Sequence, residues 1–220
     1  MKFTSVFSAP LLVVLALGTA FNASAAPKKG SAKAVAAGSA LQAYQLDTER
    51  SVLNWTGTKV TGKHVGTVKL KSGNLQIKQG KIQEGAFEID MTSLQDTDLQ
   101  DPEYKKKLET HLRSDDFFGI EKHPVATFKV TSVKLISAAA AGQANQEVTG
   151  DLTIKGITHP VTFPALVTLG KDKAEATGTV KIDRTKYEIR YGSGKFFEGL
   201  GDKMIHDEFM VDLKLVGAST

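Results

Sequence analysis

The chain has five histidines, the side chains best suited to metal binding or to acid–base chemistry at neutral pH. They are His64, His111, His123, His159 and His206. No two of them lie four residues apart, the spacing that puts two metal ligands on one face of a helix. The chain also has no cysteine, which removes thiolate catalysis and cysteine zinc sites. The spacing therefore predicts no metal site, and no cofactor is expected.

The glycine-rich segment at residues 192–201, GSGKFFEGLG, is the part most easily mistaken for a nucleotide or catalytic loop. A phosphate-binding loop has Ser or Thr after its Gly-Lys pair, whereas Phe196 follows Lys195 here. Ser193 lies in Gly-Ser-Gly, which is not the G-x-S-x-G turn of a hydrolase nucleophile. No nucleophile, base and orienting third group can be assembled from the sequence. We therefore predict no catalytic residues and no enzyme, and interpret the segment as a long flexible connection.

Three acidic residues, Asp96, Asp98 and Asp101, lie close together but lack the glycine and distal glutamate of a calcium loop. A turn followed by a helix cap explains them better. Asp101 suits an N-cap and Pro102 suits the first helical position, which predicts a helix over residues 102–113. Apolar residues four apart on one face of this helix are Tyr104, Leu108 and Leu112.

Strict alternation of apolar and polar residues dominates the rest of the chain and predicts strands with one apolar face. The alternating rows are residues 53–55, 87–91, 126–130, 148–154, 161–167, 174–182 and 209–215. Turn signals are expected at residues 62–63, 72–74, 80, 142–145 and 170–172. Short connections favour an antiparallel sheet. Such strands bury their apolar faces in a two-sheet sandwich or in a closed barrel, and the period alone does not choose between them.

Three stretches of sequence carry a resemblance to a known family. They are THLRSDDFFGIEKHPVATF at residues 110–128, GDLTIKGITHPVTFP at 150–164 and TGTVKIDRTKYEIRYGSG at 177–194. They resemble the YceI-like family of secreted or periplasmic proteins that bind polyisoprenoids or other long-chain lipids. The resemblance implies an all-β fold: a single antiparallel barrel of about eight strands, lipocalin-like, with a short inserted helix. The domain is expected over residues 43–217.

A barrel of this size can be filled by side chains or can hold one small ligand. Small residues in the inward rows, such as Ala126, Ala165 and Ala176, favour a cavity, although large residues opposite could fill that space. From alternation we predict that nine residues line the lumen: Trp55, Phe87, Ile89, Phe128, Val130, Leu152, Phe163, Val180 and Phe209. A register slip of one residue would turn each of them outward.

His111 and Arg113 belong to the first of the matching stretches and are candidates for holding a polar head group at the mouth of the lumen. The planar fork of arginine suits carboxylate or phosphate oxygens. The alternative is that both residues bond Asp115, Asp116 or loop carbonyls and fix the corner after the helix.

Two pairs of adjacent phenylalanines, at residues 117–118 and 196–197, could wall the lumen or simply pack in the core. Because neighbours in a strand face opposite sides, one member of each pair is expected to point inward.

The charge of the chain is concentrated near its N-terminus. Four of the 28 Lys and Arg residues precede residue 41, whereas all 24 Asp and Glu residues follow it, so the domain itself carries no net charge. Nucleic-acid binding needs a clustered positive field, and no nucleic-acid partner is expected. Residues 26–42 are predicted to be a flexible basic linker.

Residues 1–25 are predicted to be a cleaved signal peptide. Lys2 precedes an apolar run too short for the ~20 residues that span a bilayer, and Ala23-Ser24-Ala25 resembles a cleavage site. We expect a periplasmic or secreted protein without stable membrane insertion.

The expected function is binding of a polyisoprenoid, fatty acid or fatty amide in the lumen, as a carrier or storage protein. The alternatives are a stress-related interaction protein with a filled barrel and an enzyme of isoprenoid or lipid metabolism. A homodimer, known for some proteins of the family, is one oligomeric state to test.

Overall fold

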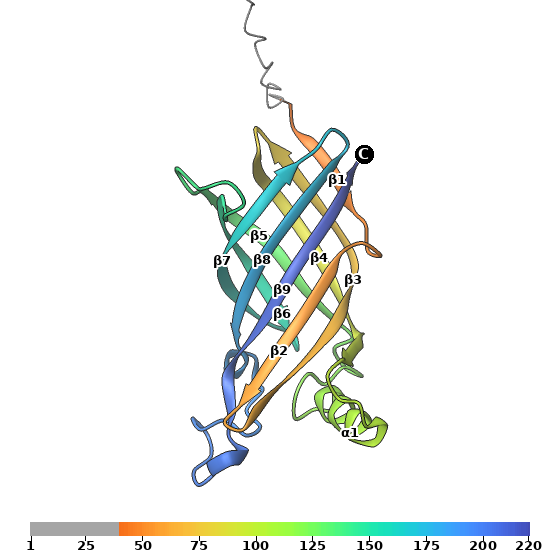
Figure 1. Cartoon of the computed structure of the whole chain (residues 1–220), viewed down its shortest axis with the longest axis vertical. Coiled ribbons are helices and arrows are strands. Elements are labelled where there is room, and N and C mark those ends of the chain that lie inside the picture. The colour runs from red at the N-terminus through yellow and green to blue at the C-terminus, as the bar shows by residue number, and fades with distance from the viewer. Residues whose placement is uncertain (1–39) are drawn as a thin grey trace, which may run out of the picture. The chain divides into compact units, whose positions relative to one another are not determined.

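A computed structural model describes residues 40–220, whose strands close into one antiparallel barrel (Figure 1). The strands are β1 (Gln42–Leu46), β2 (Val52–Lys59), β3 (Gly62–Lys78), β4 (Lys81–Asp96), β5 (Val125–Leu135), β6 (Gln146–Ile154), β7 (Ile157–Leu169), β8 (Lys173–Asp183) and β9 (Ile205–Ser219). The barrel closes because β3 pairs with β4 as well as with β2. The predicted single barrel with one short helix is therefore confirmed.

Nine strands fill eight positions because β1 and β2 share one of them. Both lie between β3 and β9 and pair with each in antiparallel register. The chain steps from one to the other through a turn that stays bonded to β9: Asp47 N–H donates to the Val216 carbonyl at 2.8 Å, and Val216 N–H donates to Ser51 Oγ at 3.1 Å. The turn between β1 and β2 therefore keeps its hydrogen bonds to β9.

Two tight turns have the backbone that right-twisted hairpins prefer, with positive φ at both central residues. Gln79 and Gly80 (φ 51° and 77°) join β3 to β4, and Lys155 and Gly156 (φ 52° and 74°) join β6 to β7. The sequence signal at Gly80 is confirmed, whereas the second turn was not predicted.

Two predicted turns differ from the structure. The turn expected at residues 62–63 lies at residues 60–61, and residues 72–74 lie inside the long strand β3. Gly73 is buried there, and a Cβ atom on it would lie 2.8 Å from Leu46 Cδ1 and 3.0 Å from Phe87 Cδ1. The glycine is needed because β1 and β4 pack closely over this point. Just before this glycine, the pairing of β3 with β4 shifts in register between Leu70 and Ser72, and such a shift bends a strand.

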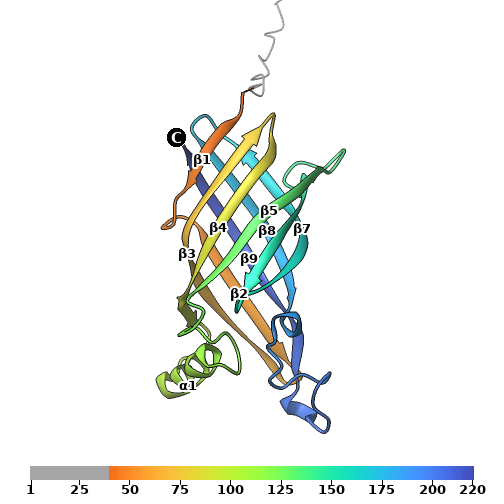
Figure 2. The same ribbon diagram turned by 180° about the vertical axis from the view of Figure 1, so that it is seen from behind.

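The helix α1 (Pro102–Arg113) has the predicted bounds and cap. The Asp101 carboxylate accepts hydrogen bonds from Glu103 N–H (2.8 Å) and Tyr104 N–H (3.2 Å), which satisfies two free donors of the first turn. Short 3₁₀ helices η1 (Arg184–Tyr187) and η2 (Gly201–Lys203) flank the glycine-rich segment before β9. Both α1 and this segment lie at the same end of the barrel (Figures 1 and 2).

The predicted signal peptide lies outside the described residues, as does nearly all of the predicted linker. The last linker residue, Gln42, begins β1 instead, and β9 extends to Ser219. No helix in residues 40–220 is long and apolar enough to cross a membrane.

Gly150 in β6 provides a stability test of the wall. A Cβ atom there would lie 2.2 Å from the Phe128 ring and 2.6 Å from the Lys129 carbonyl, which is backbone and cannot move aside. We expect Gly150→Ala to lower the free energy of unfolding by about 1–3 kcal/mol in urea titrations. The control is Gly57→Ala in β2, where a Cβ atom meets nothing within 4 Å. Equal stability of the two variants would contradict the packing.

Candidate functional site

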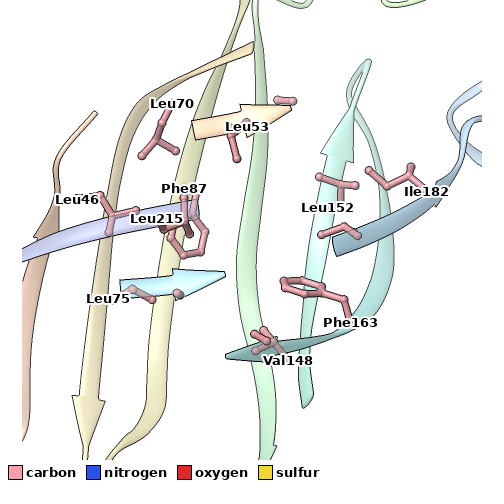
Figure 3. Close-up of a cluster of buried hydrophobic side chains, with 14 of the residues drawn as sticks. Leu46, Leu53, Leu70, Leu75, Phe87, Val148, Leu152, Phe163, Ile182 and Leu215 are labelled. Carbon is pink, nitrogen blue, oxygen red and sulfur yellow. The ribbon is translucent and has the colours of Figure 1, made fainter. Parts of the chain in front are cut away.

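The barrel encloses a cavity of about 270 Å³, lined by residues from β2 to β9 and from α1. This volume lies near the lower end of the ~300–1,000 Å³ of small-molecule sites. Apolar side chains from opposite walls point into the interior (Figure 3). Phe128, Phe209 and Ile89 face inward and yet are only partly buried, because the cavity lies in front of them. The barrel interior is therefore a hollow apolar site.

All nine residues predicted from alternation line this cavity: Trp55, Phe87, Ile89, Phe128, Val130, Leu152, Phe163, Val180 and Phe209. Three of them form an aromatic row, with the Phe128 ring centroid 5.9 Å from Phe87 and 5.8 Å from Phe163. That these side chains contact a ligand stays a prediction.

The polar side chains of the cavity wall lie at one end of the barrel. They are Thr58, Lys59, Lys63, His64, Arg184, His206 and Glu208. They come from the β2–β3 hairpin, from η1 and from the start of β9, so the sequence separates them widely. Lys59, Lys63 and Glu208 are solvent-exposed, so the cavity wall reaches solvent at this polar end.

The opposite end is filled by tightly packed side chains. Tyr44 and Ile77 are 2% and 1% exposed. Gln146 is equally buried, and its amide receives a hydrogen bond from Ile82 N–H (3.1 Å) and donates one to the Gly80 carbonyl (2.7 Å). Since that end is packed shut, a ligand would enter at the polar end.

Helix α1 and the turn after it cover part of the polar end. Leu108 and Leu112, which were predicted to share one apolar face of the helix, line the cavity, but Tyr104 is 66% exposed. The prediction is therefore wrong for Tyr104. Only the later turns of the helix lie against the barrel, so Tyr104 in the first turn faces solvent.

The expectation that one phenylalanine of each pair points inward is wrong. Phe117 and Phe118 both line the cavity, because they lie in a turn where strand alternation does not apply. Phe196 and Phe197 are 44% and 49% exposed, and neither lines it.

His111 and Arg113 do not line the cavity. The His111 ring packs edge-on against Phe117 and Tyr191, and its Nε2 lies 3.4 Å from Asp116 Oδ2. Arg113 Nη2 donates to the Leu94 carbonyl at 2.5 Å. The His111 contact is one that the structural alternative named. The Arg113 side chain bonds no residue of the corner and instead binds a carbonyl of β4, which ties the end of α1 to the barrel wall. The head-group role stays a prediction that no contact supports, and the polar end offers other candidates that spacing could not reveal.

Sequence comparison identifies the family of this barrel. A model of the YceI-like domain matches residues 44–217. The chain belongs to the YceI-like family.

The UPF0312 protein of Pseudomonas putida F1 is 32% identical over 155 residues, which cover 69% of each chain. A relative from Ectopseudomonas mendocina is 38% identical over 85 residues, 36% of this chain and 42% of that relative, so this match spans less than half of the relative.

Two solved structures resemble this barrel. BcnA of Burkholderia cenocepacia is 25% identical with a TM-score of 0.60, covering 78% of this chain and 98% of that chain. A polyisoprenoid binding domain from Saccharophagus degradans, implicated in plant cell wall breakdown, is 20% identical with a TM-score of 0.57, covering 81% and 99%. The second likeness shows the fold alone.

Arg184 anchors the polar end of this YceI-like domain. Its side chain is almost fully buried and donates to four carbonyl oxygens at 2.8–3.0 Å, while Asp207 Oδ1 lies 3.7 Å from Nη2. The four acceptors are His206, Ile189, Tyr191 and Ile205. The guanidinium thus joins the start of β9 to the segment after η1, both of which border the cavity.

A second polar cluster joins β3 to the end of β4. His64 Nδ1 lies 3.1 Å from Asp98 Oδ2 and 3.9 Å from Asp96 Oδ2. Burial raises the pKa of Asp96. Burial also opposes ionisation of Asp98. Hydrogen bonds of the Asp98 carboxylate with Val65 N–H and with the Asp96 and His64 side chains outweigh burial and lower the pKa of Asp98. The predicted turn and cap account for Asp96 and Asp101, whereas the meeting with His64 depends on the pairing of β3 with β4.

Opposite pKa shifts predict opposite effects of two matched substitutions. Asp96 has a raised folded-state pKa, so its contribution to stability is present below its ordinary pKa of 3.8 and is lost as the pH rises through the folded value. We expect Asp96→Asn to raise the free energy of unfolding at pH 7 in EDTA, with the difference vanishing near pH 3. Asp98→Asn should lower it at pH 7, because a depressed pKa stabilises above the ordinary value. Urea titrations at both pH values measure this, and a loss of stability in both variants would contradict the burial of an ionised Asp96.

Proposed function

We propose that the protein binds one long-chain apolar molecule, a polyisoprenoid or an acyl lipid, in the barrel cavity and carries or stores it outside the cytoplasm. The observation that carries the proposal is the apolar cavity whose polar lining is confined to the end that reaches solvent. A chain would lie among the apolar side chains, and its polar head would remain among the residues of the polar end. The cavity also counts against a filled barrel that acts only through its outer surface.

The YceI-like family and the polyisoprenoid binding domain of Saccharophagus degradans make prenyl lipids the first ligand class to test. We place the protein among binding proteins and not among enzymes. The titratable residues that line the cavity lie at the polar end, away from the region where the chain of a ligand would lie.

Burial of the chain would supply the affinity. Each CH₂ group removed from water contributes about 0.8 kcal/mol, which lowers Kd roughly fourfold. The loss of freedom on binding costs about 4–15 kcal/mol, so only long chains should bind well. A series of fatty acids or prenyl alcohols should therefore gain affinity with length until the cavity is full, and then gain no more.

The decisive experiment is native mass spectrometry of protein purified gently from its own cells, followed by organic extraction of what is released. A stoichiometric prenyl or acyl compound would support the proposal and name the ligand class. Protein that arrives empty and also fails to bind added prenyl and acyl lipids would overturn it. The same spectra report whether the protein is a homodimer.

The proposed location rests on residues 1–25 and has its own test. Cell fractionation should find the protein in the periplasm or the medium, and its mature N-terminus should follow Ala25. An intact N-terminus in the cytoplasmic fraction would overturn this part of the proposal.

A further inference from the structure

We propose that His64, Asp96 and Asp98 form a binding site for one divalent transition-metal ion, with Zn²⁺ as the best match, at the polar end of the barrel. Their ligand atoms, one imidazole nitrogen and two carboxylate oxygens, all lie within 4.8 Å of one another. The residues come from β3, from the last position of β4 and from the segment before α1. The inference does not depend on which molecule the cavity binds.

The distances suit a small tetrahedral ion. Bonds of 2.0–2.1 Å to zinc place neighbouring ligand atoms about 3.3 Å apart. His64 Nδ1 lies 3.1 Å from Asp98 Oδ2 and 3.9 Å from Asp96 Oδ2. Small side-chain rotations would therefore bring the three atoms onto one ion.

Both carboxylates are already oriented by the backbone. Asp96 Oδ1 accepts hydrogen bonds from Leu99 N–H (2.8 Å) and Asp98 N–H (3.2 Å), and Asp98 Oδ1 accepts one from Val65 N–H (2.7 Å). In each case Oδ2 is the oxygen that faces His64. Outer hydrogen bonds of this kind orient metal ligands and raise metal affinity.

An independent observation points to a missing cation. The Asp96 side chain is 0% exposed, and its Oδ2 has no hydrogen-bond partner although it is buried. A buried carboxylate oxygen without a partner is costly, and such groups are usually paired or bound to metal. A divalent ion between the three residues would pair this oxygen and balance both carboxylate charges.

The ligand set selects the class of ion. Ca²⁺ takes six to eight oxygen ligands, whereas this site offers two carboxylates and an imidazole. Imidazole with carboxylate suits zinc and the neighbouring transition ions. Three protein ligands leave a fourth position for water or for an oxygen of a bound molecule. Because His64 also lines the cavity, that position would lie at the edge of the cavity.

The test measures metal binding directly on tag-free, full-length mature protein stripped with EDTA. Titration calorimetry with ZnCl₂ and elemental analysis after dialysis should both give one ion per chain. Co²⁺ should give the intense visible absorption of a tetrahedral nitrogen and oxygen site. His64→Gln and Asp96→Asn should each weaken Zn²⁺ binding at least tenfold and abolish the Co²⁺ spectrum.

The matched control is His159→Gln, which removes a histidine that packs edge-on against Tyr187, outside the His64, Asp96 and Asp98 set. It should bind Zn²⁺ like the unaltered protein. Zn²⁺ should also raise the melting temperature of the unaltered protein and of this control, but not that of His64→Gln. His64 is only partly buried, so its variant should keep the circular dichroism of the folded barrel. Absence of stoichiometric binding, or binding that survives His64→Gln, would overturn the site and leave only a hydrogen bond between His64 and Asp98.

Discussion

Replacing Arg184 by methionine is expected to lower the free energy of unfolding by about 3–5 kcal/mol, the largest effect on stability that we predict. Methionine retains much of the apolar length but none of the donors. Four carbonyl oxygens would lose a donor, and Asp207 would lose one of its two neighbouring cations, keeping only Lys195 at 3.3 Å. Buried groups left without partners cost more than the bonds themselves contributed.

Arg190 provides the matched control on the same segment. Its side chain is 51% exposed, pairs with Glu188 and lies over the Phe196 ring. Exposed pairs contribute little, so Arg190→Met should cost less than about 1 kcal/mol. Guanidinium titrations followed by the fluorescence of Trp55, the one tryptophan of the chain, measure both variants. Similar losses in the two variants would mean that Arg184 does not hold the polar end.

Replacing Val211 by tryptophan is expected to weaken binding of a long-chain ligand at least tenfold, or about 1.4 kcal/mol, while the barrel stays folded. Val211 lines the cavity from β9 and is paired with Trp55 on one side and Val180 on the other. Because the side chain is only partly buried, the added ring has space in the cavity, where it would occupy volume that the ligand needs.

Met210→Trp is the control for this substitution. Met210 is the preceding residue of β9, so its side chain points away from the interior, and it does not line the cavity. Displacement of a fluorescent fatty acid, together with the amount of lipid that copurifies, should separate the two variants. If both variants bind as the unaltered protein does, the ligand does not lie in the barrel.

The sequence by itself determined which residues form the inner wall. In β8 and β9, apolar and polar residues alternate with period two, and the side chains of a strand alternate between its two faces in the same way. That local rule is enough to identify nine of the residues that line the cavity, and local capping rules are enough to place α1. Closure of the barrel followed from the resemblance to the YceI-like family and not from the period, because a sandwich requires the same alternation.

Tertiary structure alone decided the polar clusters. His64 meets Asp96 and Asp98 because of the register of β3 against β4, and Arg184 meets Ile205 and His206 because the chain returns after η1. The same reason explains two errors of prediction. Whether the glycine at residues 72–74 marks a turn or a close approach depends on what packs over it. Whether adjacent phenylalanines face opposite sides depends on whether the segment forms a strand, and Phe117 and Phe118 lie in a turn. Local periodicity reports which face a residue occupies, whereas contacts between residues distant in sequence depend on register and packing, which no single stretch of sequence contains.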